Sequence, residues 1–203
     1  VFDFHSHLPS KEICENVNYR SITELWLKAD HYKWRAMRAA GIDEHYITGD
    51  ADDLDKFRMW VKVLQRLPGS PLYHWTHLEL SRYFDIHTPL TSKNAAEIFH
   101  KCGEMLRDDG LRPVSILARS GVRALCTTDE PFDGLHWHSS IKDKGLPFRV
   151  LPTFRPDKLL RIDSSIWSGS VRRLGETEMM EIRSMGDLKT ALRKALLRFK
   201  EAG

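Results

Sequence analysis

The sequence predicts an α/β protein with a parallel sheet and a large helical insert after its first strand. Three short apolar runs, at about residues 1–5, 122–126 and 148–152, are each followed by a polar loop. Such runs are typical of buried parallel strands. Between them, apolar residues recur at helical spacing, and strands alternating with helices indicate a parallel α/β fold. The 203 residues contain no repeat or linker, so we predict a single domain over residues 1–203.

The first strand is expected to be buried, because Val1, Phe2 and Phe4 are apolar, and Pro9 ends it. The helical insert follows at about residues 10–110. Residues that cap helix N-termini indicate helix starts at Asp30, Asp50, Ser70 and Ser92. Helix ends are indicated at Gly41, Pro68-Gly69 and Gly110.

Further β/α units are predicted over about residues 111–203. A short helix near residues 112–120 leads to the second strand, and a helix at 136–143 leads to the third. The last helix is predicted over Asp187–Ala202. Because the carboxyl ends of parallel strands meet at one edge of a sheet, the polar loops after the strands are the candidates for a functional site.

Composition excludes several classes of partner. The formal charge is only +3, and basic residues are interleaved with acidic ones, which argues against a nucleic-acid partner. No apolar run is long enough to cross a membrane, and no signal peptide is visible. Cys14, Cys102 and Cys126 lie far apart, which argues against a disulfide framework or a cysteine zinc site. We therefore expect a cytoplasmic protein.

The first candidate site is the His5-Ser6-His7 segment at the end of the first strand. Side chains alternate along a strand, so His5 and His7 are expected to point to the same side. Two imidazoles placed in this way can share one divalent metal ion. The alternative is a pair of half-buried or surface histidines without a metal.

The second candidate site is the start of the helix that follows Asp30. His31 and Tyr32 at a helix N-terminus can present hydrogen bonds to a carboxylate or an oxyanion. The alternative is an ordinary amphipathic helix with Trp34 in the core and its charges in water. His74 and His77 share a helical face, but without an H-E-x-x-H pattern we predict a structural role for them.

Two loops after strands supply the remaining candidates. In TTDEP, Asp129 is a candidate for substrate binding, and the alternative is that the loop caps the next helix. In TFRPDK, Arg155 can bind a carboxylate through two parallel hydrogen bonds. The alternative for Arg155 is a surface ion pair with Asp157, which would contribute little to stability.

Taken together, five long motifs resemble the uronate (glucuronate) isomerase family of the amidohydrolase superfamily. They are FDFHSHLP, ADHYKWRAMRAAGIDEHYITGDA, PLYHWTHLEL, VRALCTTDEP and LPTFRPDK. They occur in the order of the family, and the resemblance covers residues 1–203. It implies a distorted, metal-dependent (β/α)₈ TIM barrel. It also implies conversion of D-glucuronate to D-fructuronate and of D-galacturonate to D-tagaturonate, in hexuronate catabolism.

The resemblance also assigns roles to residues. His5 and His7 match the metal ligands that follow the first strand, and zinc is the expected ion. His31 and Tyr32 match residues placed at the substrate and are the catalytic candidates. It assigns substrate binding to Arg155 and Arg112, beside Asp129 as the candidate from the TTDEP loop. The implied partner is a small hexuronate, and the sequence leaves a homo-oligomer open.

The chain departs from the family in length. Family members are much longer and supply a further metal ligand and substrate contacts on later strands. We therefore expect an incomplete barrel that is inactive alone. Two smaller departures are Glu130, where the family usually has Asp, and Phe154, where it usually has Trp. The alternatives are a metal-dependent hydrolase of the same superfamily and a non-catalytic truncated product.

Overall fold

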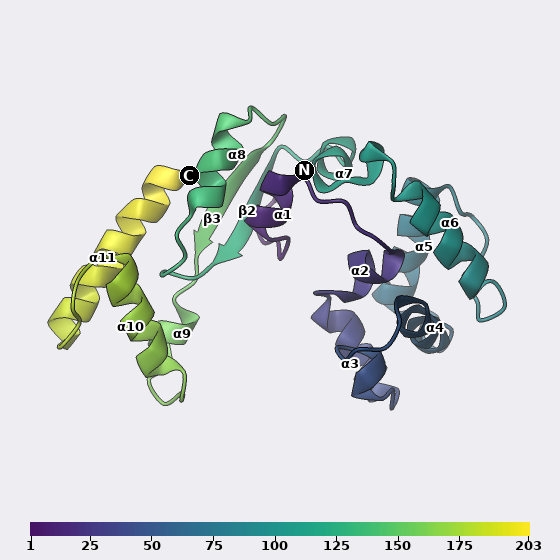
Figure 1. The fold of residues 1–203 in the computed structure, drawn as a ribbon, viewed down its shortest axis with the longest axis horizontal. Helices are drawn as coiled ribbons and strands as arrows, with labels where there is room; N and C mark the ends of the chain where they lie inside the picture. Colours follow the sequence, from purple (N-terminus) through teal and green to yellow (C-terminus); the bar gives the residue numbers. More distant parts are fainter. The chain divides into compact units, whose positions relative to one another are not determined.

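The computed structural model describes residues 1–203 and divides them into two compact units (Figure 1). The sheet unit comprises residues 1–17 and 113–203, and the helical unit comprises residues 18–112. The insert was predicted at about residues 10–110, and residues 10–17 of that range belong to the sheet unit. No helix of the chain is both long and apolar enough to span a membrane.

The sheet unit contains three parallel strands in the order β1-β2-β3. They are β1 (Phe2–Asp3), β2 (Ala124–Asp129) and β3 (Arg149–Phe154). The helices of the unit are α1 (Ser10–Glu15), α7 (Pro113–Arg119), α8 (His136–Asp143), α9 (Asp157–Leu160), α10 (Trp167–Thr177) and α11 (Met185–Ala202). The predicted α/β class with a parallel sheet is confirmed, and α8 has the predicted bounds.

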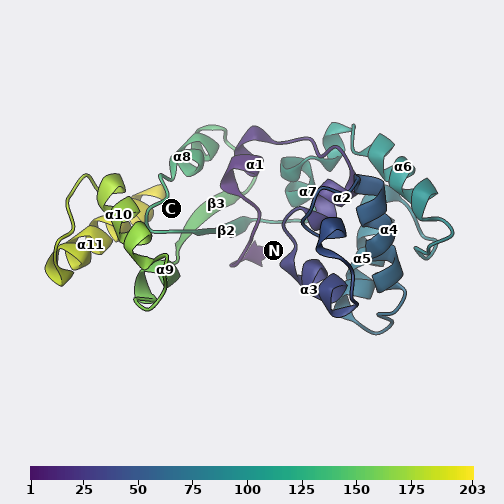
Figure 2. The ribbon, with the colours of Figure 1, turned by 60° about the horizontal axis from the view of Figure 1, so that its bottom comes forward.

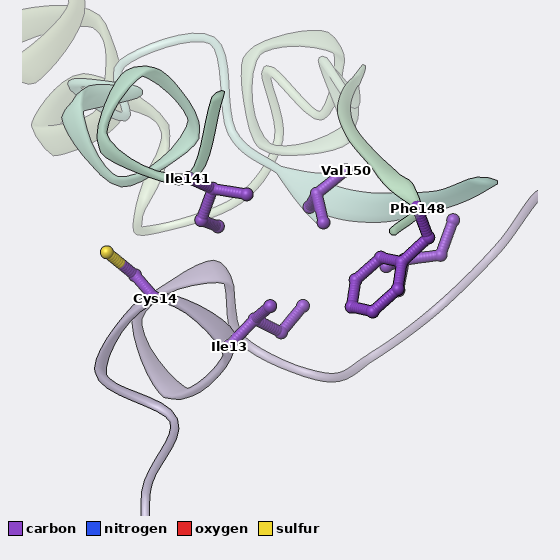
Figure 3. Packing of buried hydrophobic residues seen from close by; sticks show 6 residues of the cluster. Ile13, Cys14, Ile141, Phe148 and Val150 are labelled. Carbon is purple, nitrogen blue, oxygen red and sulfur yellow. The ribbon is translucent and has the colours of Figure 1, made fainter. Parts of the chain in front are cut away.

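Two apolar clusters hold helices against the sheet. In the first, Ile13 and Cys14 of α1 lie toward Ile141 of α8 and Phe148 and Val150 at the start of β3 (Figure 3). In the second, α11 packs against β3, and α10 contacts both α9 and α11 (Figure 2). Its buried members are Phe132, Leu159, Leu174, Leu188, Ala191 and Ala195. The helices therefore cover the strands through two separate apolar contacts.

The first strand differs from the prediction. Only Phe2 and Asp3 form β1, and Phe2 and Phe4 are 61% and 75% exposed. The expectation that this strand is buried was therefore wrong for its apolar side chains. The reason is that β1 lies at the edge of the sheet and pairs only with β2. A strand that lacks a second neighbour receives no packing from that side.

The helical unit contains five helices and two short 3₁₀ turns. The helices are α2 (Ile22–Leu27), α3 (His31–Ala39), α4 (Asp53–Leu64), α5 (Pro71–Phe84) and α6 (Ala95–Met105). The 3₁₀ turns span Glu44–Tyr46 and Asp109–Leu111. Phe57 and Trp60 of α4 are fully buried, and α4 contacts both α2 and α6. The core of this unit is therefore built around α4.

Helix capping was predicted with mixed success. The side chains of Asp30 and Ser70 accept hydrogen bonds from backbone N–H groups in the first turns of α3 and α5, as predicted. Asp50 does not cap α4: Asp52 does, and the carboxylate of Asp50 lies 2.8 Å from Nδ1 of His45. Asn94, not Ser92, precedes α6. A run such as GDADD offers several acidic caps, so spacing alone does not select one.

Leu125 of β2 gives a test of the sheet-unit core. It is fully buried, whereas Leu197 of α11 is 54% exposed. Leu125→Ala is expected to lower the free energy of unfolding by about 2–5 kcal/mol, because it leaves a cavity. Leu197→Ala, the matched control, is expected to change it by about 0.5 kcal/mol or less. Urea unfolding, monitored by hydrogen exchange of the β2 amides, measures the free energy of unfolding of both variants. An equal loss of free energy in the two variants would contradict the packing described.

Candidate metal and substrate site

The His5-Ser6-His7 segment leaves β1 and runs beside β2. The backbone N–H of Ser6 donates to the carbonyl of Cys126 at 2.8 Å, and the N–H of His5 donates to the carboxylate of Asp3 at 3.2 Å. These bonds bring the two exposed imidazoles together, with their Nε2 atoms 3.0 Å apart. The prediction that His5 and His7 point to the same side is therefore confirmed.

The two imidazoles have the geometry of partial metal ligands. Zinc–nitrogen bonds are about 2.0–2.1 Å long, so two nitrogens 3.0 Å apart can both reach one ion. However, no group of three His, Cys, Asp or Glu side chains in residues 1–203 is placed to hold a metal. The pair therefore fits two positions of a ligand set and does not complete one.

His31 and Tyr32 are the first two residues of α3. Oδ1 of Asp30 accepts hydrogen bonds from the backbone N–H groups of Tyr32 and Lys33 at 2.9 and 3.1 Å, which fixes the start of the helix. The rings of His31 and Tyr32 lie side by side, with centroids 4.3 Å apart, and Tyr32 is 56% exposed. The two side chains are thus brought together at a capped helix terminus. They belong to the helical unit, whereas His5 and His7 belong to the sheet unit.

A buried charge cluster underlies this terminus. Lys33 is only 7% exposed, and its Nζ lies 2.6 Å from Oδ2 of Asp30 and about 6 Å from the ring centroids of Trp26 and Trp60. Burial raises the pKa of Asp30, but the hydrogen bond and charge of Lys33 outweigh it, so this pKa lies below its usual value. Burial and the charge of Asp30 raise the pKa of Glu79 on α5, against the opposing effect of Lys33.

Asp129 lies in β2 and not in a loop. The strand was predicted to end at 126, but it continues through Thr127 and Asp129, and both side chains are buried. Oδ2 of Asp129 accepts hydrogen bonds from the Thr127 hydroxyl at 2.7 Å and from the N–H of Thr153 at 3.2 Å. Neither Thr127 nor Asp129 caps α8, which has no side-chain cap. The carboxylate that sequence analysis offered to a substrate is therefore directed into the protein.

The two candidate arginines each have an acidic neighbour. Nε of Arg155 lies 3.2 Å from Oδ2 of Asp157, and the two side chains are 42% and 64% exposed, so the predicted alternative of a surface ion pair is present. The backbone N–H of Arg155 donates to the carbonyl of Asp129 at 3.0 Å. Arg112, in the helical unit, pairs with Asp109 at 2.8 Å, and its buried Nε has no hydrogen-bond partner.

Two buried polar residues of the structure were not predicted from the sequence. Neither Lys33 nor His138 is among the candidate residues that the sequence predicts, although both are buried. His138 stands three residues before Ile141 on α8, and both are buried. A histidine in register with the apolar face of a helix was the available signal.

Other features of the chain are structural. His77 uses both ring nitrogens, Nδ1 at 2.8 Å from the carbonyl of Tyr73 and Nε2 as acceptor from the N–H of Leu90 at 3.0 Å, as its predicted structural role requires. Burial raises the pKa of the Cys102 thiol to about 12, so it stays protonated as a packing residue. A hollow of about 960 Å³ between α10 and α11 is lined by none of the predicted site residues.

Comparison with known proteins gives a consistent result. A family model described as glucuronate isomerase matches residues 1–203. Proteins named uronate isomerase from Bacillus pumilus and Caldicellulosiruptor saccharolyticus are 45% and 46% identical to the chain. The matches cover 100% of the chain but 42% and 44% of these relatives. The chain thus spans less than half the length of the curated relatives that it matches.

Solved structures agree on the fold. The crystal structure of uronate isomerase from Thermotoga maritima matches with a TM-score of 0.94 and 34% identity, over 100% of this chain and 45% of that one. The glucuronate isomerase structure from Caulobacter crescentus also gives a TM-score of 0.94, at 23% identity, over 100% of this chain and 44% of that one. The second match bears on the fold alone.

Glu79 provides a test of the charge cluster beneath α3. Its pKa in the folded chain is raised from 4.5, so its contribution to stability is fully present at low pH and declines as pH rises through the raised pKa. Glu79→Gln removes this decline. The unfolding free energy of the variant relative to the parent is therefore expected to increase as pH is raised above about 4.5, the ordinary glutamate value.

Urea unfolding of both proteins across this pH range measures the change. Glu104→Gln is the surface control, because it removes one negative charge at an exposed position where the carboxylate pairs with Arg107. The test is the free energy of unfolding of Glu79→Gln minus that of the parent. If this difference is constant with pH, or falls as pH rises, burial does not disfavour the Glu79 carboxylate.

Proposed function

Because this chain belongs to the glucuronate isomerase family, we propose that it contributes to the aldose–ketose isomerisation of hexuronates. The reactions are D-glucuronate to D-fructuronate and D-galacturonate to D-tagaturonate, in hexuronate catabolism. The observation that carries the proposal is the family match over all of residues 1–203. The paired imidazoles of His5 and His7 support it independently of the comparison.

We propose that the sheet unit is the beginning of a (β/α)₈ barrel. Three parallel strands in sequence order, with α8 between β2 and β3, are the repeating pattern of such a barrel. A complete barrel of this type takes about 250 residues, and the relatives are more than twice as long as this chain. Residues outside 1–203 would then supply the remaining strands and part of the site.

In this proposal His5 and His7 hold a divalent metal ion, with zinc as the expected ion. Bound there, it would polarise the substrate carbonyl and orient the substrate oxygens. The exposure of both imidazoles leaves room for ligands from residues outside the chain. This agrees with the absence of a three-residue metal group within residues 1–203.

Substrate binding is assigned to side chains near helix and strand ends. His31 and Tyr32 would hold hydroxyl or carboxylate oxygens of the uronate through their side chains, at the capped terminus of α3. Arg155 would bind the substrate carboxylate by exchanging Asp157 for it, and Arg112 is a second candidate. Isomerisation moves a proton from C2 to C1, and we assign its base to residues outside 1–203.

The setting of the reaction is also part of the proposal. We propose a cytoplasmic protein whose partner is a small hexuronate, without nucleic-acid or membrane partners. A homo-oligomer stays a prediction from the sequence. The hydrolase alternative has no observation in its favour, because the matching relatives carry the name of the isomerase.

Activity of two lengths of the protein tests the proposal directly. The 203-residue chain is expected to be inactive on D-glucuronate and D-galacturonate, because in this proposal the base and further metal ligands belong to residues outside 1–203. A version extended to the length of the relatives is expected to form the ketose, read directly by NMR. If the extended version is folded but inactive, the isomerase proposal is wrong. If the 203-residue chain is active, the assignment of the base and further metal ligands to residues outside 1–203 is wrong.

The metal-ligand role of His5 is tested separately in the extended version. His5→Ala is expected to weaken metal binding by more than about tenfold, since even the loss of an outer-shell partner costs that much. His74→Ala, at an exposed histidine of α5, is the control and should leave metal content unchanged. Metal content after dialysis, measured by elemental analysis, decides the question. Equal retention in both variants would rule out His5 as a ligand.

A further inference from the structure

A buried polar network lies at the end of β2. The Thr127 hydroxyl is 2.7 Å from Oδ2 of Asp129 and 2.8 Å from Nε2 of His138 on α8. Thr127, Asp129 and His138 are only 2%, 8% and 2% exposed. Alternation along β2 places Thr127 and Asp129 on the same face, toward α8. The proposed reaction uses none of the contacts within this network.

The hydrogen atoms of the network follow from its chemistry. A threonine hydroxyl has one hydrogen, and the carboxylate of Asp129 is its strongest nearby acceptor. Nε2 of His138 then donates to the Thr127 oxygen, which fixes the Nε2–H tautomer and leaves the buried Nδ1 without a partner. Burial lowers the pKa of His138, against the opposing charges of Asp129 and Asp133, so the ring is neutral.

The network does not have the geometry of a nucleophilic triad. In such a triad the carboxylate orients the imidazole, and the hydroxyl is exposed to the substrate. Here Oδ2 of Asp129 lies 3.8 Å from Nε2 of His138, beyond hydrogen-bond distance, and the hydroxyl is buried between them. The arrangement is suited to holding the backbone in place and not to attacking a substrate.

Asp129 contacts the chain that carries Arg155 at two points. Its carboxylate accepts a hydrogen bond from the N–H of Thr153 at 3.2 Å. Its carbonyl accepts a hydrogen bond from the N–H of Arg155 at 3.0 Å. The residues on either side of Phe154 are therefore both attached to one residue of β2, which is itself held by Thr127 and indirectly by His138.

We propose that Asp129, Thr127 and His138 are positioning residues that fix the end of β3 and thereby place Arg155, and that Asp129 does not contact the substrate. The inference rests on the proposed function, in which Arg155 binds the substrate carboxylate. It replaces the substrate-binding role that the sequence suggested for Asp129. A carboxylate already engaged by two donors in a buried site is not available to a hexuronate, which carries a negative charge of its own.

The first experiment measures the network without using activity. Thr127→Val keeps the shape of the side chain but removes the hydroxyl, whereas Thr127→Ser keeps the hydroxyl. In the extended version, Thr127→Val is expected to speed hydrogen exchange at the amides of Thr153 and Arg155 by about tenfold, the change that about 1.4 kcal/mol gives. Thr127→Ser is expected to restore slow exchange. Thr190→Val, at an exposed threonine of α11, is the control.

The second experiment links the network to substrate binding. Thr127→Val is expected to raise KM for D-glucuronate about tenfold while kcat changes less, because misplaced Arg155 loses ground-state binding. Thr127→Ser is expected to return KM close to the parent value. If Thr127→Val does not fold, His138→Leu provides a second variant, which removes the donor to Thr127 and keeps the hydroxyl.

The outcomes separate the inference from the function on which it rests. Faster exchange together with a raised KM supports positioning. Faster exchange with an unchanged KM, while Arg155→Lys raises KM, overturns it. A KM raised by Asp129→Asn but not by Thr127→Val also overturns it, in favour of direct substrate contact. If Arg155→Lys leaves KM unchanged, Arg155 loses its assigned role and the inference falls with it, while activity of the parent still upholds the isomerase reaction.

Discussion

The parallel pairing of β2 with β3 is the constraint on which the sheet unit depends. All six residues of each strand are in register, from Ala124 opposite Arg149 to Asp129 opposite Phe154. A shift by one residue would turn every side chain to the other face. The register therefore places Leu125 in the apolar core and brings the N–H of Thr153 to the carboxylate of Asp129. It also fixes the position at which the chain leaves β3.

The helical unit depends on a different kind of constraint, the pairing of buried charge. An ammonium group taken out of water is costly unless a partner and aromatic neighbours surround it, and Lys33 has both. Asp30 serves two purposes, since one oxygen caps α3 and the other binds Lys33. The orientation of His31 and Tyr32 thus follows from an interaction beneath the helix that neither of them makes. In both units, the residues that carry candidate chemistry are held by polar groups directed inward.

Local features of this architecture could be predicted from the sequence, and contacts between distant segments could not. Alternation predicted that His5 and His7 lie on one side, which holds although β1 ends at Asp3, and capping preferences found Asp30. The end of β2 was missed because Thr127 and Asp129 are polar, and only their contacts with His138 and Thr153 explain why polar residues continue the strand. The prediction that the first strand is buried was wrong for a similar reason. Packing depends on neighbouring strands, which a sequence pattern does not reveal. Of the candidate site, residue types and pairs were predictable, but the inward direction of Asp129 was not.

The two edges of the sheet are protected unequally against self-association. In β3, the N–H groups of Arg149 and Arg155 point to β2, so alternation turns position 152 outward, where Pro152 offers no donor to another strand. The edge at β1 has no such proline, and Phe2 and Phe4 are exposed beside it. An apolar, unguarded edge is a template for intermolecular strand addition. The edge at β1 is therefore the more open of the two to pairing with another strand.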